Sequence, residues 1–316
     1  MKFSKDFKEI KGDASFRKFY RNTKKNSIIV FANKEKTKNL LIYDSINKIL
    51  IKNNIIAPQL LSQNYKKNYI EIQDLGKKTI YQIFSNYKKK QYPIFKKAIN
   101  VLNKIQLVKD KKIKNFKNEF YLIKDYKNKI LLDEANLFSH WYVPKKLDKK
   151  KINIFKTKFN REIKLLLSKL HFKNDTFVHR DFHVSNLIIN SKNQIGLIDN
   201  QDALIGNKAY DLASLIDDVR YETSNSLKEK VYNYYLMTNK KIDADKFKND
   251  YDILSVLRNL KIIGIFMRLA ERDKKRKYLK LIPYAWKMID NRISKNKNLV
   301  NLKFLLETNF PKFITK

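Results

Sequence analysis

Hydrophobic residues in the first 75 positions gather in short runs that are rich in β-branched and aromatic side chains. Phe16–Arg21 and Ser27–Phe31 are two such runs, and a polar turn over residues 22–26 separates them. Leucines and isoleucines over residues 40–50 then recur at helical spacing, and Tyr69–Ile72 has the pattern of a further strand. We therefore expect a small, antiparallel, β-rich lobe that contains one helix.

From residue 76 onward the apolar positions follow a helical period, as over Ile94–Leu107 and Phe155–Leu170. The one β-like interruption is expected around residues 177–200. No internal repeat is evident, and no linker rich in Pro, Gly or Ser divides the chain. The pattern predicts two lobes, one over residues 1–75 and a larger, mainly helical one over residues 76–316.

The most informative stretch runs from Phe177 to Ile189. It places His179 two residues before Asp181, Asn186 five residues after Asp181, and an apolar strand directly after Asn186. A second apolar run then ends at Asp199. This order matches the catalytic loop of kinases and the metal-binding aspartate that follows it.

Phosphoryl transfer explains these residue types. The attacking hydroxyl needs an acceptor for its proton, and the Asp181 carboxylate can supply it. Magnesium prefers oxygen ligands, so Asn186 and Asp199 are the predicted metal ligands. Residues 179–218 hold six acidic and three basic residues inside a chain of net charge +38, and such a local excess of carboxylates suits a divalent cation. We therefore predict an α+β, protein-kinase-like bilobal fold that uses ATP and Mg²⁺.

Other polar residues of this region are expected to support the catalytic loop. His179 and Arg180 flank Asp181, and His183 is expected to brace the loop by hydrogen bonding rather than to perform chemistry. Asp211 should begin a helix, where its charge suits the helix dipole, and could also hold the loop. Asp202 lies either behind the metal ligands or in a simple turn, and both alternatives stay open.

A tight turn just before the first clear strand is the candidate phosphate-binding element. Gly12, Ser15 and Phe16 belong to it, and its backbone N–H groups and the Ser15 hydroxyl could face the ATP phosphates. The alternative is a hairpin turn without a ligand, because the triple-glycine pattern of protein kinases is missing.

Kinases also place a cation on the third strand to hold the phosphates. Lys34 is one candidate, but it lies beyond the run that ends at Phe31. Arg17 and Arg21 could replace it, and Asp44 is the acid in the predicted helix that could pair with such a cation. The sequence leaves this position open.

Composition narrows the function further. Lys and Arg number 69 against 31 acidic residues, which favours anionic partners. The lysines are spread along the whole chain together with many Asn, Ile, Phe and Tyr, so codon bias is the preferred explanation of the positive charge and a nucleic-acid partner is not expected.

Without cysteine the chain can form no disulfide or cysteine-ligated zinc site. Since it shows no apolar run of membrane-spanning length and no signal peptide, we expect a cytoplasmic protein.

Glycine is rare, with five residues in the chain: Gly12, Gly76, Gly196, Gly206 and Gly264. In so glycine-poor a chain, we expect each to occupy a position where a Cβ is not tolerated.

Several segments, in order along nearly the whole chain, carry a family resemblance. They are Gly12–Arg21, Gln73–Gly76, Leu132–Val143, the catalytic stretch, Asp199–Ser214 and Gly264–Ala270 with Arg272, Asp273, Tyr278 and Leu279. The chain resembles the aminoglycoside phosphotransferase superfamily, and within it the bacterial anomeric kinases that phosphorylate N-acetylmuramate and N-acetylglucosamine at C1 in cell-wall recycling. Where that family is expected to have Met-Asp-Ala-Pro after the third strand, this chain has Phe31-Ala32-Asn33-Lys34, so the phosphate contact there is in doubt.

The resemblance implies an ATP-dependent transfer of the γ-phosphate to an amino-sugar hydroxyl. Ile72 and Gln73, at the start of the hinge, would then contact ATP. Glu134 and Trp141 are candidates for the sugar site, one as a hydrogen-bond acceptor and the other as an apolar face. Their alternatives are a helix-surface acid and a core aromatic residue.

Two rival functions remain. One is a kinase of another small alcohol, such as an aminoglycoside or a choline- or ethanolamine-like compound. The other is a catalytically silent module that binds nucleotide or RNA. The sequence leaves the oligomeric state open.

Overall fold

The computed structural model describes residues 6–10, 17–32, 39–86 and 91–314. Its chain groups into two compact units, the first made of Met1–Lys124 with His179–Leu204 and the second of Asp125–Val178 with Ile205–Lys316. Each of these units combines two separate segments of the chain, so they differ from the two lobes predicted from the sequence, residues 1–75 and 76–316. The lobe boundary near residue 75 stays a prediction.

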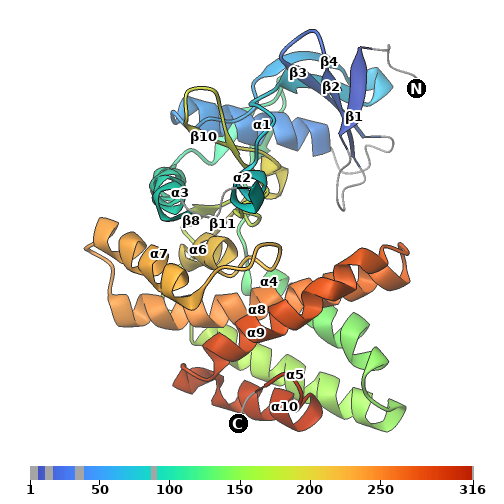
Figure 1. The fold of residues 1–316 in the computed structure, drawn as a ribbon, viewed down its shortest axis with the longest axis vertical. Helices are drawn as coiled ribbons and strands as arrows, with labels where there is room; N and C mark the ends of the chain where they lie inside the picture. The colour runs from blue at the N-terminus through green and yellow to red at the C-terminus, as the bar shows by residue number, and fades with distance from the viewer. Residues whose placement is uncertain (1–5, 11–16, 33–38, 87–90, 315–316) are drawn as a thin grey trace. The chain divides into compact units, whose positions relative to one another are not determined.

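An antiparallel sheet with the strand order β1-β2-β3-β5-β4 forms the N-terminal part of the first unit (Figure 1). The strands are β1 (Phe7–Ile10), β2 (Lys18–Asn22), β3 (Ser27–Phe31), β4 (Leu60–Asn64) and β5 (Tyr69–Gln73), and the helix α1 (Asn39–Lys52) joins β3 to β4. Leu40 and Tyr43 of α1 pack on Val30 and Ile70 of the sheet in a buried apolar cluster. The predicted β-rich region with one helix is confirmed, and β2, β3, β5 and α1 lie within about two residues of the expected bounds. The strands β1 and β4 were not predicted.

The rest of the first unit contains most of the stretch that was predicted to be catalytic. It consists of α2 (Ile80–Asn86), α3 (Gln91–Gln106), β6 (Lys112–Lys114), β7 (Phe120–Leu122), β9 (Leu187–Ile189), β10 (Ile195–Leu197) and the 3₁₀ turn η5 (Asn200–Asp202). The hairpin of β6 and β7 was not predicted, and the expectation of a single β-like interruption after residue 76 is wrong. Each of its strands has only three residues, and β7 exposes Phe120 and Leu122, so the alternation of hydrophobic and polar residues is too short and too irregular to recognise.

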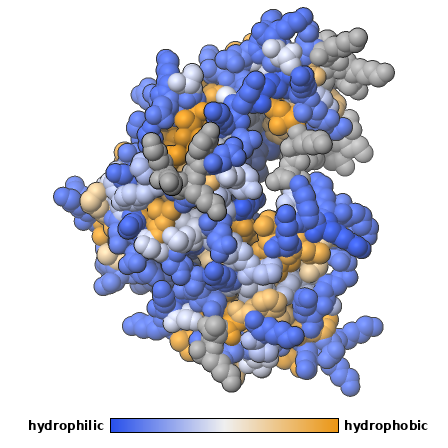
Figure 2. Space-filling view, viewed as in Figure 1, coloured by the Kyte–Doolittle hydropathy of each residue, from blue (hydrophilic) through white to orange (hydrophobic). Residues whose placement is uncertain are grey.

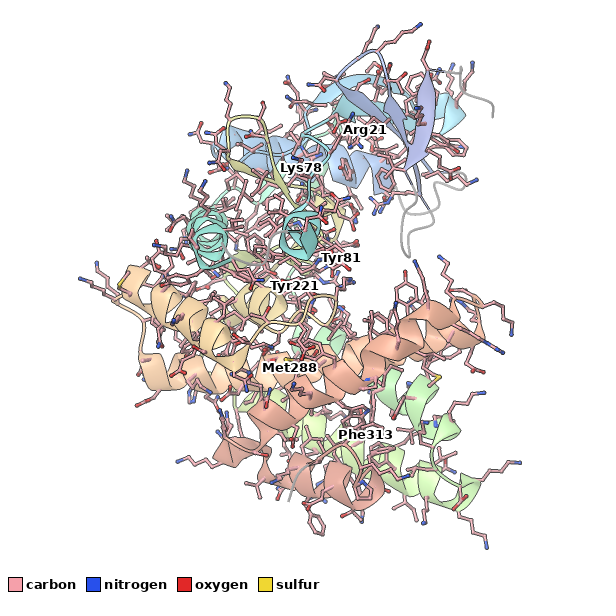
Figure 3. The ribbon with its side chains drawn as sticks, viewed as in Figure 1. Arg21, Lys78, Tyr81, Tyr221, Met288 and Phe313 are labelled. Carbon is pink, nitrogen blue, oxygen red and sulfur yellow. The ribbon has the colours of Figure 1, made fainter. Side chains whose placement is uncertain are left out.

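The second unit is mainly helical (Figure 1). Its elements are α4 (Asn128–Leu137), the π-helical turn η3 (Phe138–Tyr142), α5 (Lys149–Ser168), β8 (Thr176–Val178), β11 (Leu204–Gly206), α6 (Ala209–Ile216), α7 (Asn225–Thr238), α8 (Ala244–Glu271), α9 (Ile282–Ile293) and α10 (Val300–Asn309). Most of α8 is buried, as expected for a helix that other helices cover on several sides. Phe138, Tyr142, Trp286 and Phe310 form an aromatic core, and Phe313 stacks on Trp286 at 5.1 Å between ring centroids (Figure 3).

Hydrophilic side chains cover most of the face drawn in Figure 2 and are not gathered into one stripe. Among the described residues, no helix is both long and apolar enough to cross a membrane.

Gly264 allows α8 to cross the end of α4 at very short range. A Cβ at this position would lie 2.3 Å from the backbone carbonyl carbon of Leu137 and 2.5 Å from the backbone nitrogen of Phe138. Because backbone atoms cannot swing aside as a side chain can, the expectation that this glycine excludes a Cβ is confirmed. The same expectation is confirmed for Gly76 for a different reason, since its φ of +131° is a conformation that L-residues rarely adopt.

The second unit also contains a buried ionic cluster around Asp217. Lys228 donates to Asp217 at 2.9 Å, Arg292 donates to both of its carboxylate oxygens, and Ser255 donates at 2.7 Å. Although burial opposes ionisation, the charges of Lys228 and Arg292 hold the pKa of Asp217 well below its ordinary value. This carboxylate therefore balances two buried cations.

We predict that Gly264→Ala destabilises the protein by about 2–3 kcal/mol, the range of an overpacked core. The added methyl group must push α8 away from the Leu137–Phe138 backbone. Denaturant unfolding measures the change, and Lys246→Ala, at an exposed position of the same helix, should stay within about 0.5 kcal/mol of the wild type. An equally small effect of Gly264→Ala would contradict the tight crossing.

We also predict that Asp217→Asn costs about 3–5 kcal/mol at neutral pH, because two buried cations lose their counter-charge. The folded-state pKa of Asp217 lies below its unfolded value of about 3.9, so its contribution is complete above about pH 4 and is lost as the pH falls further. The stability difference between wild type and variant should therefore shrink in acid. A difference that stays constant down to about pH 2 would refute this electrostatic account.

Candidate active site

The antiparallel hairpin of β9 and β10 brings Asn186 and Asp199 to the same end. Leu187 pairs with Leu197, and one further hydrogen bond runs from the backbone N–H of Ile198 to the carbonyl of Asn186 at 3.1 Å. Asn186 directly precedes β9, and Asp199 follows β10 by two residues. An antiparallel hairpin places the start of one strand beside the end of the other, so residues that are 13 positions apart in the sequence become neighbours.

A turn in front of β9 holds the backbone of Asp181 close to Asn186. The carbonyl oxygen of Asp181 accepts hydrogen bonds from the backbone N–H of His183 at 2.9 Å and from the side-chain amide of Asn186 at 3.1 Å. The carbonyl of His183 accepts from the backbone N–H of Asn186 at 2.9 Å. His183 thus braces the loop through its backbone, and its buried ring lies 3.5 Å from the Asn186 amide nitrogen.

His179 links this turn to β10. Its Nδ1 accepts from the backbone N–H of Asp181 at 3.3 Å, so its proton lies on Nε2, which is 3.2 Å from the carbonyl of Ile198. The ring is fully buried. The imidazole of His179 therefore fixes the loop residue Asp181 relative to the residue that precedes Asp199.

Arg180 and Asp199 both have left-handed backbone conformations, with φ of 73° and 63°. Such angles are uncommon outside glycine, and strained residues of this kind are concentrated at functional sites. Arg180 donates to the backbone carbonyl of Asp202 at 3.1 Å, and the carboxylate of Asp202 accepts from Gln201 at 2.6 Å. Asp202 is thus the exposed residue of the turn η5, where its role stays a prediction.

The oxygens of Asn186 and Asp199 fit a divalent cation. Asn186 turns its amide nitrogen toward Asp181, and within the described part of the chain its Oδ1 accepts no hydrogen bond. The Asp199 side chain is 35% exposed, and Oδ1 is its hydrogen-bonded oxygen. No cluster of three or more His, Asp and Glu residues that could hold a metal occurs among the described residues. One carboxylate and one amide oxygen leave further coordination positions to phosphates and water, as Mg²⁺ sites commonly do.

Arg17 is the hydrogen-bond partner of the Oδ1 oxygen of Asp199. Its Nη2 donates to Asp199 Oδ1 at 2.6 Å, and its guanidinium lies over the rings of Phe19 and Tyr43 at 5.7 and 5.8 Å. Tyr43 is buried on α1, and one turn further along this helix the Oδ1 of Asn47 accepts from Asn200 at 2.8 Å. The helix α1 and the segment after β10 are therefore joined next to Asp199.

The remaining candidate cations have other partners. Arg21 donates to both carboxylate oxygens of Asp74 and to the carbonyl of Gly76 at 3.0 Å, which ties β2 to the segment after β5 (Figure 3). Asp44 pairs with Lys48 of its own helix at 2.8 Å. Lys34 lies outside the described residues, as do Gly12, Ser15 and Phe16 of the predicted phosphate-binding turn.

Ile72 and Gln73 lie at the end of β5, opposite Ile28 and Ser27 of β3. Ile72 is buried in the sheet core, and Gln73 is exposed. Their contact with a nucleotide stays a prediction.

Three predicted residues belong to the second unit. Glu134 on α4 pairs with Lys261 at 2.9 Å and accepts a hydrogen bond from the Tyr126 hydroxyl. With its side chain 13% exposed, it is no helix-surface acid. Trp141 is half-buried in η3, and Asp211 lies buried in the first turn of α6, which confirms that it begins a helix.

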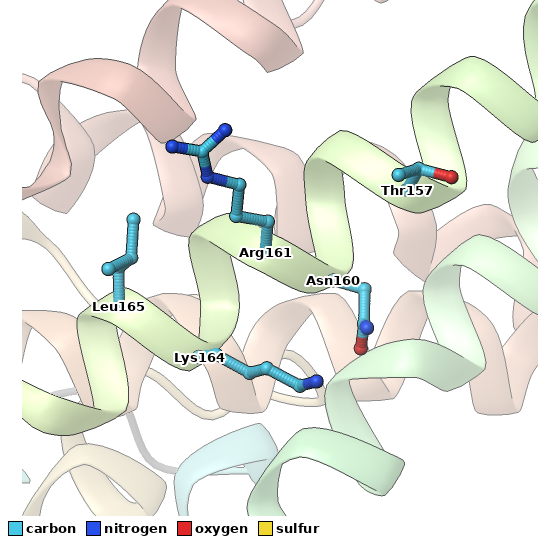
Figure 4. Close-up of a pocket in the computed structure, with 5 residues that line it drawn as sticks. All are labelled: Thr157, Asn160, Arg161, Lys164 and Leu165. Atoms are coloured by element: carbon cyan, nitrogen blue, oxygen red, sulfur yellow. The ribbon is translucent and has the colours of Figure 1, made fainter.

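Two pockets are lined by none of the predicted site residues. One is lined by Thr157, Asn160, Arg161, Lys164 and Leu165 of α5 (Figure 4), and the other by Lys77, Lys78, Gln82, Ile83 and Asn86 around α2. Neither has a carboxylate that could serve the predicted chemistry.

Tyr43, Asn47 and Asn200 were not predicted to belong to this region. The signal was present, because Tyr43 and Asn47 are four residues apart and so share one face of a helix whose neighbouring positions are apolar. A polar residue on a buried face needs a hydrogen-bond partner, and here Asn200 is that partner.

A model of the family described as phosphotransferase enzyme family matches residues 6–246. The chain is 26% identical over 301 residues to an N-acetylmuramate/N-acetylglucosamine kinase of Pseudomonas putida, which covers 93% of this chain and 85% of that relative. Among solved structures it is similar to a choline/ethanolamine kinase family protein from Mesorhizobium loti, with a TM-score of 0.63, 10% identity and coverage of 96% and 93% of the two chains.

A spectinomycin phosphotransferase solved with ADP and spectinomycin is also similar, with a TM-score of 0.56, 16% identity and coverage of 94% and 92% of the two chains. These similarities confirm the predicted protein-kinase-like fold. By the match along most of its length, the chain belongs to the phosphotransferase enzyme family and is a kinase with an alcohol group as acceptor.

Proposed function

We propose that the protein transfers the γ-phosphate of ATP to an amino sugar, at the anomeric hydroxyl of N-acetylmuramate or N-acetylglucosamine. One observation carries the proposal: the β9–β10 hairpin holds the side-chain oxygens of Asn186 and Asp199 at one end, beside the turn that contains Asp181. The similarity of nearly the whole chain to the sugar kinase of Pseudomonas putida supports the substrate class.

Asp181 accepts the proton of the attacking sugar hydroxyl in this proposal. Its backbone is fixed by His179, His183 and Asn186, so its carboxylate starts from a defined position. Asn186 and Asp199 would hold Mg²⁺, which when bound offsets the negative charge of the phosphates. Arg180, which donates to the carbonyl of Asp202, would keep the following turn in place.

Glu134 and Trp141 are proposed to contact the sugar. Lys261 and Tyr126 fix the orientation of the Glu134 carboxylate, and an acceptor held in this way suits recognition of a sugar hydroxyl. The half-buried indole of Trp141 offers an apolar face.

The net charge of +38 favours this substrate class over aminoglycosides and choline. Those compounds are cations, which a strongly basic protein repels at long range, whereas the carboxylate of N-acetylmuramate is attracted.

Purified protein should consume ATP with N-acetylmuramate or N-acetylglucosamine and form a phosphate ester at the anomeric carbon. ATP consumption coupled to product analysis by phosphorus NMR measures this. Kanamycin, choline and ethanolamine should support turnover at least about tenfold more slowly, since none of them has a free anomeric hydroxyl. Faster turnover with any of these three would overturn the assignment of the anomeric hydroxyl as the acceptor.

Asp181→Asn should lower kcat by about 10²- to 10⁴-fold, the usual contribution of a general base. Nucleotide affinity should persist, because the amide has the size of the carboxylate. Asp133→Asn, which removes an exposed carboxylate of α4, is the matched control and should keep full turnover. Undiminished turnover of Asp181→Asn would rule out its role as the base.

A further inference from the structure

The guanidinium of Arg17 is a buried charge directly beside the predicted metal ligand. The Arg17 side chain is 4% exposed, while that of its partner Asp199 is 35% exposed. Two aromatic rings lie near the guanidinium, that of Phe19 from the following strand and that of Tyr43 from α1. A cation so far removed from water is costly unless charged or aromatic groups compensate it, and here both kinds do.

The stability of the folded protein is a weak explanation for the ion pair between Arg17 and Asp199. Replacing a buried ion pair by apolar residues is often neutral or stabilising, so its presence is weak evidence for a structural role. The pair also joins residues 182 positions apart, at the carboxylate that the proposed chemistry needs for a cation. Its location indicates a role in ligand binding.

The third strand of this kinase carries no cation. Kinases place a lysine there, where it binds the α- and β-phosphates and pairs with a glutamate of the following helix. Here β3 reads Ser-Ile-Ile-Val-Phe, and α1 presents Tyr43 and Asn47 toward the region of Asp199. The structure also removes Arg21 from the candidates, because Asp74 and Gly76 hold its guanidinium.

We propose that Arg17 takes the place of the strand-three lysine and exchanges partners during nucleotide binding. In the observed geometry it pairs with Asp199. When the nucleotide is bound, the guanidinium turns to the phosphates, and the carboxylate of Asp199 is released for the cation. This inference rests on the proposed function, since it requires that the protein binds a nucleotide.

The chemistry of arginine suits the exchange. A guanidinium keeps its charge when buried and offers a planar fork of N–H donors that fits a phosphate as well as a carboxylate. The guanidinium lies over the rings of Phe19 and Tyr43, while its Nη2 donates to Asp199. Because one arginine serves both anions, binding of the divalent cation and binding of the phosphates are linked.

Arg17→Met, which keeps much of the side-chain volume without the charge, tests the exchange in the full-length protein. Calorimetry without metal should show ATP binding weakened by roughly 10- to 100-fold, the value of a charge-assisted hydrogen bond. Adenosine binding should be unchanged, which would also show that the variant is folded. Mn²⁺ alone, measured by the EPR signal of the free ion, should bind several-fold more tightly than to the wild type, because a cation next to Asp199 is gone.

Two further variants complete the design. Arg17→Lys keeps the charge but not the fork, and it should lose less ATP affinity than Arg17→Met. Lys52→Met removes a cation of α1 that pairs with Asp110 on the surface, and it should behave as the wild type in all three measurements.

The possible failures are distinct. If the wild type binds neither ATP nor adenosine, the proposed function fails and this inference fails with it. If the wild type binds ATP and Arg17→Met retains the same ratio of ATP to adenosine affinity, the exchange alone is refuted. Unchanged or weaker Mn²⁺ binding by Arg17→Met would equally refute it.

Discussion

The hydrogen-bonded ladder between β9 and β10 holds the candidate active site together. It continues for one bond beyond the paired strands, from Ile198 to Asn186, and His179 adds a second link between the same segment and the backbone of Asp181. Asn186, Asp199 and the backbone of Asp181, the groups proposed for the chemistry of phosphate transfer, are therefore anchored at one short hairpin by hydrogen bonds. Side-chain packing elsewhere can vary without moving these groups.

Much of this hairpin could be predicted because its information is local. The order His179, Asp181, Asn186 and Asp199 within 21 positions, with apolar runs between them, indicates a strand–turn–strand unit and its chemistry. The strand Ser27–Phe31 was likewise predicted with its observed bounds, since β-branched residues and a polar turn mark it. Local patterns of this kind do not depend on the rest of the fold.

What the sequence did not predict are contacts between distant segments. The pairing of Arg17 with Asp199 spans 182 positions, and that of Asn47 with Asn200 spans 153. Neither periodicity nor spacing specifies a partner at such separations. The hairpin of β6 and β7 was missed for a different reason, because its three-residue strands are too short to show a period. The contacts of Gly12, Ser15, Phe16 and Lys34 stay predictions.

The backbone of Asp199 affects how substitutions at this position must be interpreted. Its φ of 63° is a conformation that aspartate, asparagine and glycine tolerate better than other residues do. An alanine there would remove an oxygen ligand and strain the main chain at once, by about 1 kcal/mol or more. Asparagine removes only the charge, and glycine removes the side chain while relaxing the main chain. Comparing these three residues separates the contribution of the carboxylate from that of the turn that presents it.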